Sequence, residues 1–300
     1  MTQGTTGPGN NFGGALWMLL SGLAYSVAMA LVKLLGATYS SATQNFVRQS
    51  IGLIFLLPFI LRNPRDAFTL TRPALMFFRC AATSLSIILA YNSFHALPLA
   101  EANALTFTRA LFLVPLAALL LNERIDRHKV FATMLGFGGV LVILSPGSSR
   151  SLPVLPAAEG LLGALLVSWS VIGVKTMTAD HSGLALITWS SLLGALFTAP
   201  FAMMDWRTPT GVDLALLTVM GVLGVVTQTC YIRGMTLGEA SVMAPLDYVR
   251  ILFTSALGLA IFGEWPRRET LMGAGIIIAA ALYVTLHGRK RDLARELQRR

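Results

Sequence analysis

The sequence predicts an all-α membrane protein of ten transmembrane helices, built as two inverted repeats of five helices. Three observations lead to this prediction. Of 300 residues, 55% are hydrophobic and 12% are charged, and the mean hydropathy is +0.68; typical soluble domains carry about 25% charged residues. The apolar residues fall in stretches long enough to cross a membrane. The second half of the chain also resembles the first at an offset of about 140 residues.

Residues 1–12, MTQGTTGPGNNF, are polar, Gly-rich and uncharged, which predicts a disordered leader. No basic region with a small-residue cleavage site precedes the first apolar stretch. We therefore interpret that stretch as a retained helix and not as a signal peptide.

A membrane-spanning helix needs about 20 largely apolar residues. Predicted spans without Asp, Glu, Lys or Arg are 13–32, 80–100, 130–149, 181–204, 214–232 and 270–288. The predicted spans that contain charges are 42–61 with Arg48, 99–121 with Arg109, 159–178 with Lys175, and 239–262 with Asp247 and Arg250. The connections are short, so no stretch remains for a soluble domain.

Most of the loop Lys and Arg residues fall on the side that carries both termini, which predicts that both termini are cytoplasmic. The opposite loops hold Arg150, Arg207, Arg267 and Arg268. Residues 289–300 form a basic tail that anchors this orientation; the alternative is a short helix that lies on anionic headgroups.

The internal repeat consists of matches that occur in the same order in both halves, with at least one in each predicted helix. They pair Ser26 and Lys33 with Ser168 and Lys175, Gly52 and Pro58 with Gly194 and Pro200, Tyr91 with Tyr231, Glu101 with Glu239, Arg109 with Arg250, Glu123 with Glu264, and Gly136 and Gly138 with Gly273 and Gly275. The repeats are residues 13–148 and 149–288. Because each has an odd number of helices, the second enters the membrane from the opposite side. Inverted repeats of this kind are typical of secondary transporters.

The fourth helix of each repeat has an Arg-x-Leu-Phe segment and ends in LLLNER or AIFGEW. With these paired segments the chain resembles the drug/metabolite transporter superfamily, and more narrowly its EamA-like branch, over about residues 14–287. Within that branch it is similar to bacterial amino-acid exporters, including exporters of aromatic amino acids. The resemblance implies a central cavity surrounded by helices, in a bacterial inner membrane. One departure is Asn122, where the second repeat has Gly263.

Charged residues deep in predicted spans are candidates for the substrate site. Arg109 and Arg250 lie at equivalent positions of the two repeats, near the membrane midplane. A charge there costs at least about 2.5–3.5 kcal/mol unless it faces water or a partner. Asp247 lies three residues before Arg250, a spacing that permits an ion pair. In one interpretation these residues only stabilise the core. In the other, an arginine binds the carboxylate of an amino acid, and Asp247 meets its ammonium or carries a coupling proton.

Aromatic and amide side chains at similar depth are candidates to line the cavity. They are Tyr25, Tyr91, Trp169, Trp189, Gln228 and Tyr248. Trp169 is too deep for an interfacial belt, so it indicates either a cavity wall or plain packing. Tyr91 is nearer a helix end and also fits a belt.

Arg48, Glu123 and Glu264 are candidate gate residues. Arg48 either contacts a gate or extends its side chain to the membrane surface. Glu123 and Glu264 fall at membrane boundaries on opposite faces; each either closes one side by pairing with loop bases or is a solvated helix end. Lys33 and Arg79, near helix ends, are expected to extend to the surface.

The small residues Gly136, Gly138, Gly139, Gly273 and Gly275 predict close helix packing, within one protomer or between two. The protein is thus expected to be a monomer or a homodimer.

The sequence argues against several other classes. Cys80 and Cys230 fall inside apolar stretches, and His95, His128, His181 and His287 are dispersed, so neither a metal site nor a cofactor is expected. The net charge of +9 lies in loops and one tail, not on a surface for nucleic acid. No phosphate-binding GxxxxGK[ST] segment occurs.

The predicted function is therefore a secondary transporter, not an enzyme, that exports amino acids and related small metabolites by alternating access around a midplane site. Alternative cargoes are nucleotide-sugars, other metabolites or cationic drugs. A channel or an intramembrane enzyme is less favoured, because no ring of pore charges and no paired acid and base are evident.

Overall fold

The computed structural model describes residues 11–121, 127–144, 152–177, 180–237, 243, 246–280 and 282–283. Within these ranges the regular structure is helical and no strand occurs, which confirms the all-α class. The helices are α1 (Asn11–Leu35), α2 (Ser41–Arg62), α3 (Pro64–Ala67), α4 (Pro73–Ala96), α5 (Leu99–Thr106), α6 (Arg109–Leu121), α7 (Arg127–Leu144), α8 (Val154–Met177), α9 (Gly183–Met204), α10 (Gly211–Leu237), the 3-10 helix η1 (Asp247–Val249) and α12 (Arg250–Phe262). A further helix covers residues 268–280.

Several predicted features lie outside the described residues. They are the leader up to residue 10, the tail 289–300, and the gate candidate Glu123.

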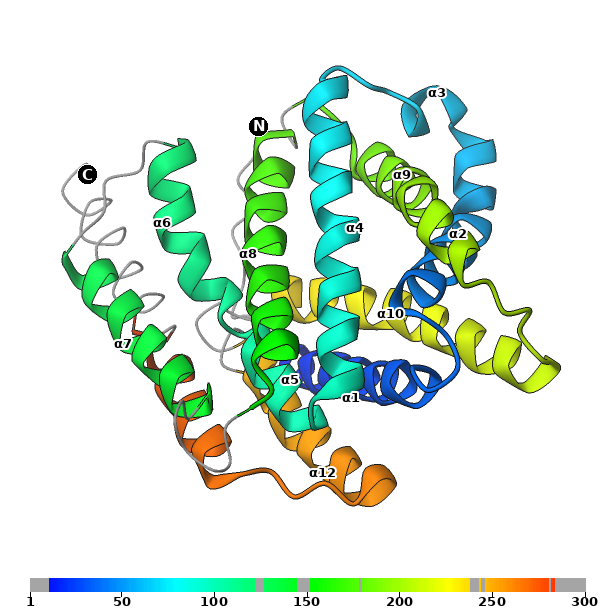
Figure 1. Cartoon of the computed structure of the whole chain (residues 1–300). Helices are drawn as coiled ribbons and strands as arrows, with labels where there is room; N and C mark the ends of the chain where they lie inside the picture. Colours follow the sequence, from blue (N-terminus) through cyan, green and yellow to red (C-terminus); the bar gives the residue numbers. More distant parts are fainter. Residues whose placement is uncertain are drawn as a thin grey trace, which may run out of the picture.

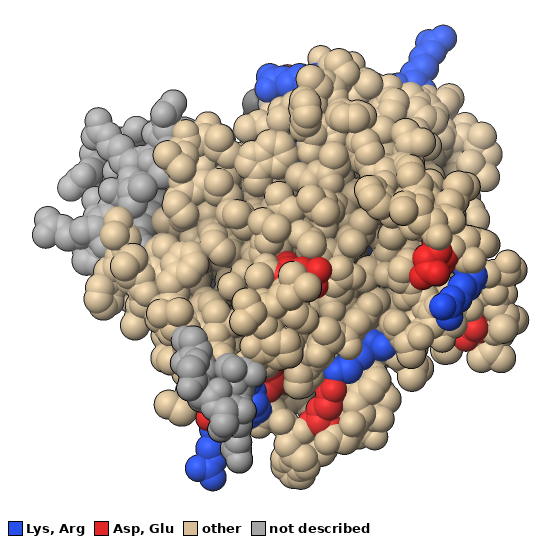
Figure 2. All heavy atoms as spheres, viewed as in Figure 1, with Lys and Arg blue, Asp and Glu red and all other residues tan. Residues whose placement is uncertain are grey.

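Six described helices are long and apolar enough to cross a membrane. They cover Phe12–Leu35, Ser41–Arg62, Pro73–Ala96, Val154–Val174, Gly183–Met204 and Gly211–Met235. Large apolar side chains such as Phe59, Leu119 and Met204 are exposed, and Figure 2 shows few charged side chains on a largely uncharged surface. Exposed apolar surface of this extent is typical of a protein surrounded by lipid.

The predicted span 99–121 is not one continuous helix, because the chain changes its hydrogen-bonding pattern in the middle. Between α5 and α6, the N–H groups of Phe107, Thr108, Ala110 and Leu111 each donate to the carbonyl three residues earlier, at 2.9–3.2 Å. The Thr108 hydroxyl donates to the Leu105 carbonyl at 2.7 Å and so partners a group that the interruption frees from the α-helical ladder. Pro115 lies inside α6.

The second repeat is interrupted at the equivalent place. Asp247–Val249 form the 3-10 helix η1, and α12 begins at Arg250, just as α6 begins at Arg109. A 3-10 stretch inside a helix often marks a functional hinge. Both central arginines therefore lie directly after a local change of helix type.

Helix α4 differs from the predicted span 80–100. Pro73 begins it, since a proline at the first helical position has no N–H to leave unpaired. It ends at Ala96 because Leu97 takes an extended conformation before Pro98. Arg79 is consequently inside the helix, 4% exposed, and donates to Ser190 Oγ at 2.5 Å. The expectation that Arg79 extends to the membrane surface is wrong, because its side chain lies between α4 and α9.

The helix contacts between the two halves follow a symmetric pattern. Helix α1 packs on α10, α4 on α8, and α2 on α9, so the first helix of each repeat meets the third of the other (Figure 1). Helices α5 and α6 pack on α8, as η1 and α12 pack on α1. Two repeats related by an axis through the middle of the molecule would produce this symmetric pattern of contacts, so the packing supports the inverted repeat.

Helix α7 and the helix over 268–280 approach closely at two of the predicted glycines. A Cβ atom added to Gly273 would lie 2.5 Å from the carbonyl oxygen of Gly139. A Cβ atom added to Gly275 would meet nothing within 4 Å. The predicted packing of small residues within one protomer is therefore confirmed at Gly139 and Gly273.

We expect Gly273→Ala to lower the thermal unfolding midpoint in detergent, because the backbone of α7 must move away from the added methyl group, at a cost of about 1–3 kcal/mol. Gly275→Ala is the matched control on the same helix. It should leave the midpoint unchanged or raise it slightly, since alanine favours a helix more than glycine does. Equal midpoints for the two variants would contradict the close packing.

Candidate substrate site

Arg250 is the most deeply enclosed charge of the central region. It is the first residue of α12 and is 6% exposed. Its guanidinium carbon lies 4.7 Å from the centre of the Tyr25 ring on α1 and 4.8 Å from that of Phe107, between α5 and α6. Cation–π contacts of desolvated groups contribute about 2 kcal/mol each. The two rings thus help to hold the guanidinium and leave its edges for hydrogen bonds.

One edge of this guanidinium has no hydrogen-bond partner. Within the described part of the chain, Nε and Nη2 of Arg250 are buried and form no hydrogen bond. Buried N–H groups, above all charged ones, are normally paired, because leaving them unpaired costs free energy. An unpaired, enclosed Arg edge is therefore a candidate site for an anionic group.

Asp247 connects the two central arginines. Its Oδ2 lies 3.1 Å from Arg109 Nη2 and 3.6 Å from Arg250 Nη2. The Arg109 side chain is 44% exposed, against 7% for Arg250 and 18% for Asp247. The structure therefore brings together the three charged residues that the sequence singled out, and their summed formal charge is positive.

A serine from each repeat reaches the backbone of the other repeat at this site. Ser26 Oγ on α1 donates to the Arg250 carbonyl at 3.3 Å, and Ser168 Oγ on α8 donates to the Arg109 carbonyl at 2.8 Å. Ser26 and Ser168 were matched across the repeats from sequence alone. These bonds tie the first helix of each repeat to the interrupted helix of the other.

Phe107 is a site residue that the sequence interpretation missed. Its ring meets Tyr248 edge-on, with centroids 5.0 Å apart. The repeat offset gave a signal for it, because Phe107 stands to Arg109 as Tyr248 stands to Arg250. Two equivalent aromatic rings therefore meet beside the Arg250 guanidinium.

The other predicted lining residues are distributed differently. Tyr91 is buried in the main core, against which Tyr25 and Tyr248 also pack. Trp169 follows Ser168 on α8 and is partly buried, whereas Gln228 on α10 is exposed. These positions are compatible with a cavity wall but are not in themselves contacts with Arg250.

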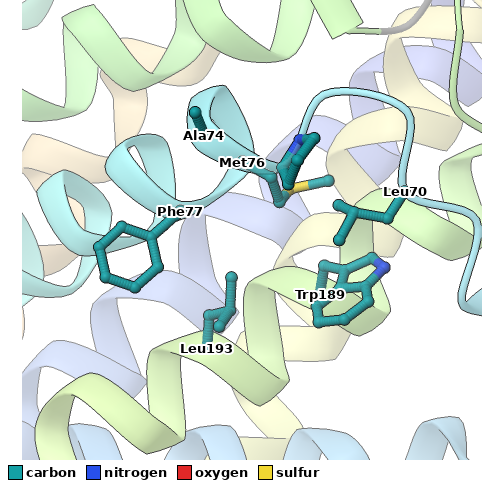
Figure 3. A pocket seen from close by; sticks show the side chains of 7 residues that line it. Leu70, Ala74, Met76, Phe77, Trp189 and Leu193 are labelled. Carbon is teal, nitrogen blue, oxygen red and sulfur yellow. The ribbon is translucent and has the colours of Figure 1, made fainter.

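Trp189 does not join this group. It packs with Met76, Cys80, Met177 and Leu186 in a second, smaller core, and its ring meets Phe68 edge-on. Figure 3 shows it beside a cavity of about 320 Å³, which is lined by Leu70, Pro73, Ala74, Met76, Phe77, Trp189 and Leu193. The lining is apolar and carries no charge, so this cavity has no evident means to select a zwitterion.

The gate candidate Arg48 is partly buried on α2 and donates from Nη2 to Asn45 Oδ1 at 3.2 Å. It also approaches α10, where a Cβ atom added to Gly224 would lie 3.8 Å from Arg48 Nη1. Its side chain thus turns toward neighbouring helices.

Glu264, the other described gate candidate, pairs with Lys33 of α1, so its partner is a base within a helix and not a loop base as expected. Lys33 also donates to the Leu97 carbonyl at 2.7 Å, and Glu264 Oε2 accepts the Leu99 N–H of α5 at 2.9 Å. Lys33 therefore does not extend to the surface as expected. We call Lys33, Glu264 and the backbone of Leu97 and Leu99 the latch.

Further polar contacts join helix ends on the same face as the latch. Glu101 of α5 is fully buried and accepts hydrogen bonds from Thr270 Oγ1 at 3.0 Å and from Arg267 Nε at 3.4 Å. Tyr39, in the turn after α1, donates to Asp213 at 2.7 Å, and this bond raises the pKa of the Tyr39 phenol. These contacts join helix ends on the face of the molecule that carries the latch.

Metal binding finds no support in the described residues, because they contain no cluster of three or more His, Cys, Asp or Glu side chains that could hold an ion.

The model of the EamA-like transporter family matches residues 12–145 and again residues 157–286, once in each half of the chain. A solved crystal structure shares the fold, with a TM-score of 0.61 over 92% of this chain and 97% of that chain, at 17% identity.

Curated relatives match over nearly the whole chain. The S-adenosylmethionine uptake transporter of Rickettsia prowazekii is 28% identical and covers 92% of this chain and 94% of its own length. The riboflavin transporter of Rhizobium johnstonii is 28% identical, with 93% of each chain covered. The pseudopaline exporter CntI of Pseudomonas aeruginosa is 26% identical, with 90% of this chain and 94% of its own length covered.

These relatives are transporters of different small molecules, in both directions, so amino-acid export in particular is not established by the similarity. The two matches of the family model agree with the internal repeat, and they identify a transporter, not an enzyme. The chain belongs to the EamA-like transporter family.

Proposed function

We propose that this protein is a secondary transporter for small metabolites that carry an amino-acid group, with export of amino acids as the expected activity. The observation that carries the proposal is the buried edge of Arg250, where two N–H groups form no hydrogen bond although an aspartate lies within ion-pair distance. Hydrogen bonds between a guanidinium and a carboxylate are strong and geometrically selective.

In this proposal the cargo lies between the two repeats with its carboxylate on Arg250. Both arginines contact the same oxygen of Asp247, Oδ2, which leaves Oδ1 for the ammonium of a zwitterion. Tyr25, Phe107 and Tyr248 offer aromatic surface to an apolar or planar side chain. Trp169, Gln228 and Tyr91 are the next candidates to line the path.

Transport would proceed by alternating access through ten spans in a bacterial inner membrane, with both termini cytoplasmic. The two 3-10 interruptions are the proposed hinges, because they lie at equivalent positions and directly beside the charged groups. Contacts of the latch keep one face closed, so the opposite face is the open or opening side in this state. With the predicted orientation, the closed face is the external one.

The relatives support a cargo of this chemistry in part. S-adenosylmethionine, the named cargo of one relative, is an amino-acid derivative with a carboxylate and an ammonium. Riboflavin, the named cargo of another, is instead a planar aromatic molecule. An Arg edge surrounded by aromatic rings offers contacts to both kinds of molecule.

The test is flux in proteoliposomes that contain only this protein. Labelled aromatic, aliphatic, hydroxyl and charged amino acids, S-adenosylmethionine and riboflavin would be loaded with and without a pH gradient. We expect saturable flux of several amino acids that compete with one another, and its response to the gradient would report proton coupling. Well-folded protein that moves none of the amino acids would contradict the proposed cargo.

A further inference from the structure

Asp247 lies between two arginines at unequal distances. Its Oδ2 is 3.1 Å from Arg109 Nη2, within hydrogen-bond range, and 3.6 Å from Arg250 Nη2, beyond it. Arg109 therefore donates a hydrogen bond to Asp247, and Arg250 does not. Asp247, although it is only three residues from Arg250, is therefore hydrogen-bonded to Arg109 of the other repeat.

The Arg250 edge, to which Asp247 makes no hydrogen bond, presents two neighbouring N–H groups. Nε and Nη2 are the neighbouring N–H groups on one side of the guanidinium. Both are buried without a hydrogen-bond partner in the described part of the chain, although Nη2 lies within ion-pair distance of Asp247. Two parallel N–H groups match the two oxygens of a planar carboxylate. The rings of Tyr25 and Phe107 restrain the guanidinium, so a carboxylate must approach in its plane.

A carboxylate on Asp247 has the same chemistry as the carboxylate of a cargo, so it competes for the same edge. Asp247 is three residues before Arg250, close enough for a modest movement of its side chain to reach Nη2. If nothing else held Asp247, the protein's own acid would fill the site.

We propose that Arg109 is a positioning residue that holds Asp247 away from Arg250 and so keeps the Arg250 edge free for the carboxylate of the cargo. This inference rests on the proposed function, in which Arg250 receives that carboxylate. Arg109 acts through Asp247, and its exposed side chain is suited to this role because it need not be enclosed with the cargo. The pair also links the repeats, since Arg109 begins α6 and Asp247 begins η1.

The proposal gives the two central arginines different roles although they are equivalent in the repeat. Arg250 binds the cargo, and Arg109 restrains the competing acid. The difference in side-chain exposure, 7% against 44%, fits this division.

The experiment measures binding of carboxylate probes to the purified full-length protein in detergent by calorimetry. The probes are L-phenylalanine, L-methionine and benzoate, with the corresponding amides as neutral controls. In the Arg109→Gln protein we expect binding of the carboxylates to weaken about tenfold or more, because Asp247 then pairs with Arg250. The double variant Arg109→Gln with Asp247→Asn should regain benzoate binding to within about threefold of the wild type, since the asparagine is a weak competitor.

Arg72→Gln is the matched control. Arg72 is also a partly exposed arginine, 2.7 Å from Asp180, and lies outside the substrate site. Its replacement removes the same charge and a similar ion pair, and should leave benzoate binding unchanged. The thermal unfolding midpoints of all variants separate loss of binding from loss of fold. The Arg109→Lys variant, which keeps the charge beside Asp247, serves the same purpose.

Two results would overturn the inference while the proposed function stands. One is that the Arg109→Gln protein binds the carboxylates as tightly as the wild type does. The other is that Arg109→Gln weakens this binding and the additional Asp247→Asn substitution does not restore it. Wild-type protein that prefers none of the carboxylates over their amides would instead overturn the proposed carboxylate site itself, and this inference with it.

Discussion

Replacement of Arg250 by glutamine is expected to lower carboxylate-dependent flux by about 100-fold or more, because two charge-assisted hydrogen bonds and an enclosed positive edge of the site are lost. Arg250→Lys keeps the charge but presents a single point in place of two parallel N–H groups, so we expect an intermediate loss of about tenfold. The measurement is the initial rate of saturable flux in proteoliposomes, normalised to reconstituted protein.

Arg79 provides the matched control, since it is also buried in a membrane-spanning helix and lies away from the site, between α4 and α9. Arg79→Gln removes a buried guanidinium and its bond to Ser190, so it should lower the thermal unfolding midpoint. Its flux per folded molecule should remain near that of the wild type. A well-folded Arg250→Gln protein that transports normally would show that the site lies elsewhere.

The sequence predicted the parts of this molecule that depend on composition and periodicity. The apolar stretches became helices, and the repeat offset identified Arg109, Arg250, Ser26 and Ser168 as equivalent pairs before any contact was known. The serine pair was matched without a role, because hydrogen bonds to a backbone carbonyl depend on how the repeats face each other.

What the sequence could not predict are contacts between distant segments. Lys33 and Glu264 are 231 positions apart, and the prediction that Lys33 extends to the surface considered only its own helix. The 3-10 interruptions also escaped prediction, because residues 99–121 read as one apolar span. The repeat pairs Phe107 with Tyr248, so the sequence contained a signal for a role of Phe107. Phenylalanine has no polar group, however, and the candidates at this depth were aromatic residues with a polar group and amides.

The latch should determine which face of the transporter is closed. Glu264 accepts from Lys33 and from the first N–H of α5, and no side chain of α5 itself caps that helix end. Removal of one partner from a largely buried ion pair costs about 3 kcal/mol or more. This energy favours the closed state of the latch face, so its loss shifts the population toward the state open on that face.

We therefore expect Glu264→Gln to expose the interior side of α5 to reagents that approach from the latch face. The reporter is Ala104→Cys, at a fully buried position of α5, in a background that lacks Cys80 and Cys230. Labelling by a membrane-impermeant maleimide should be about tenfold faster or more in the Glu264→Gln protein, as a shift of about 1.4 kcal/mol or larger between two states predicts. The measurement is the labelling rate in proteoliposomes with the latch face outward.

Glu159→Gln is the control on the same face, because Glu159 accepts a hydrogen bond from Asn92 that an amide oxygen can replace. It should leave the labelling rate unchanged. If Lys33→Met accelerates labelling as Glu264→Gln does, the ion pair is the main restraint. If only Glu264→Gln does so, the bond to the Leu99 N–H is the main restraint, because only that variant weakens it. Unchanged labelling in both variants would mean that Glu101, Arg267 and Thr270 are sufficient to keep the face closed, and that the latch does not control access.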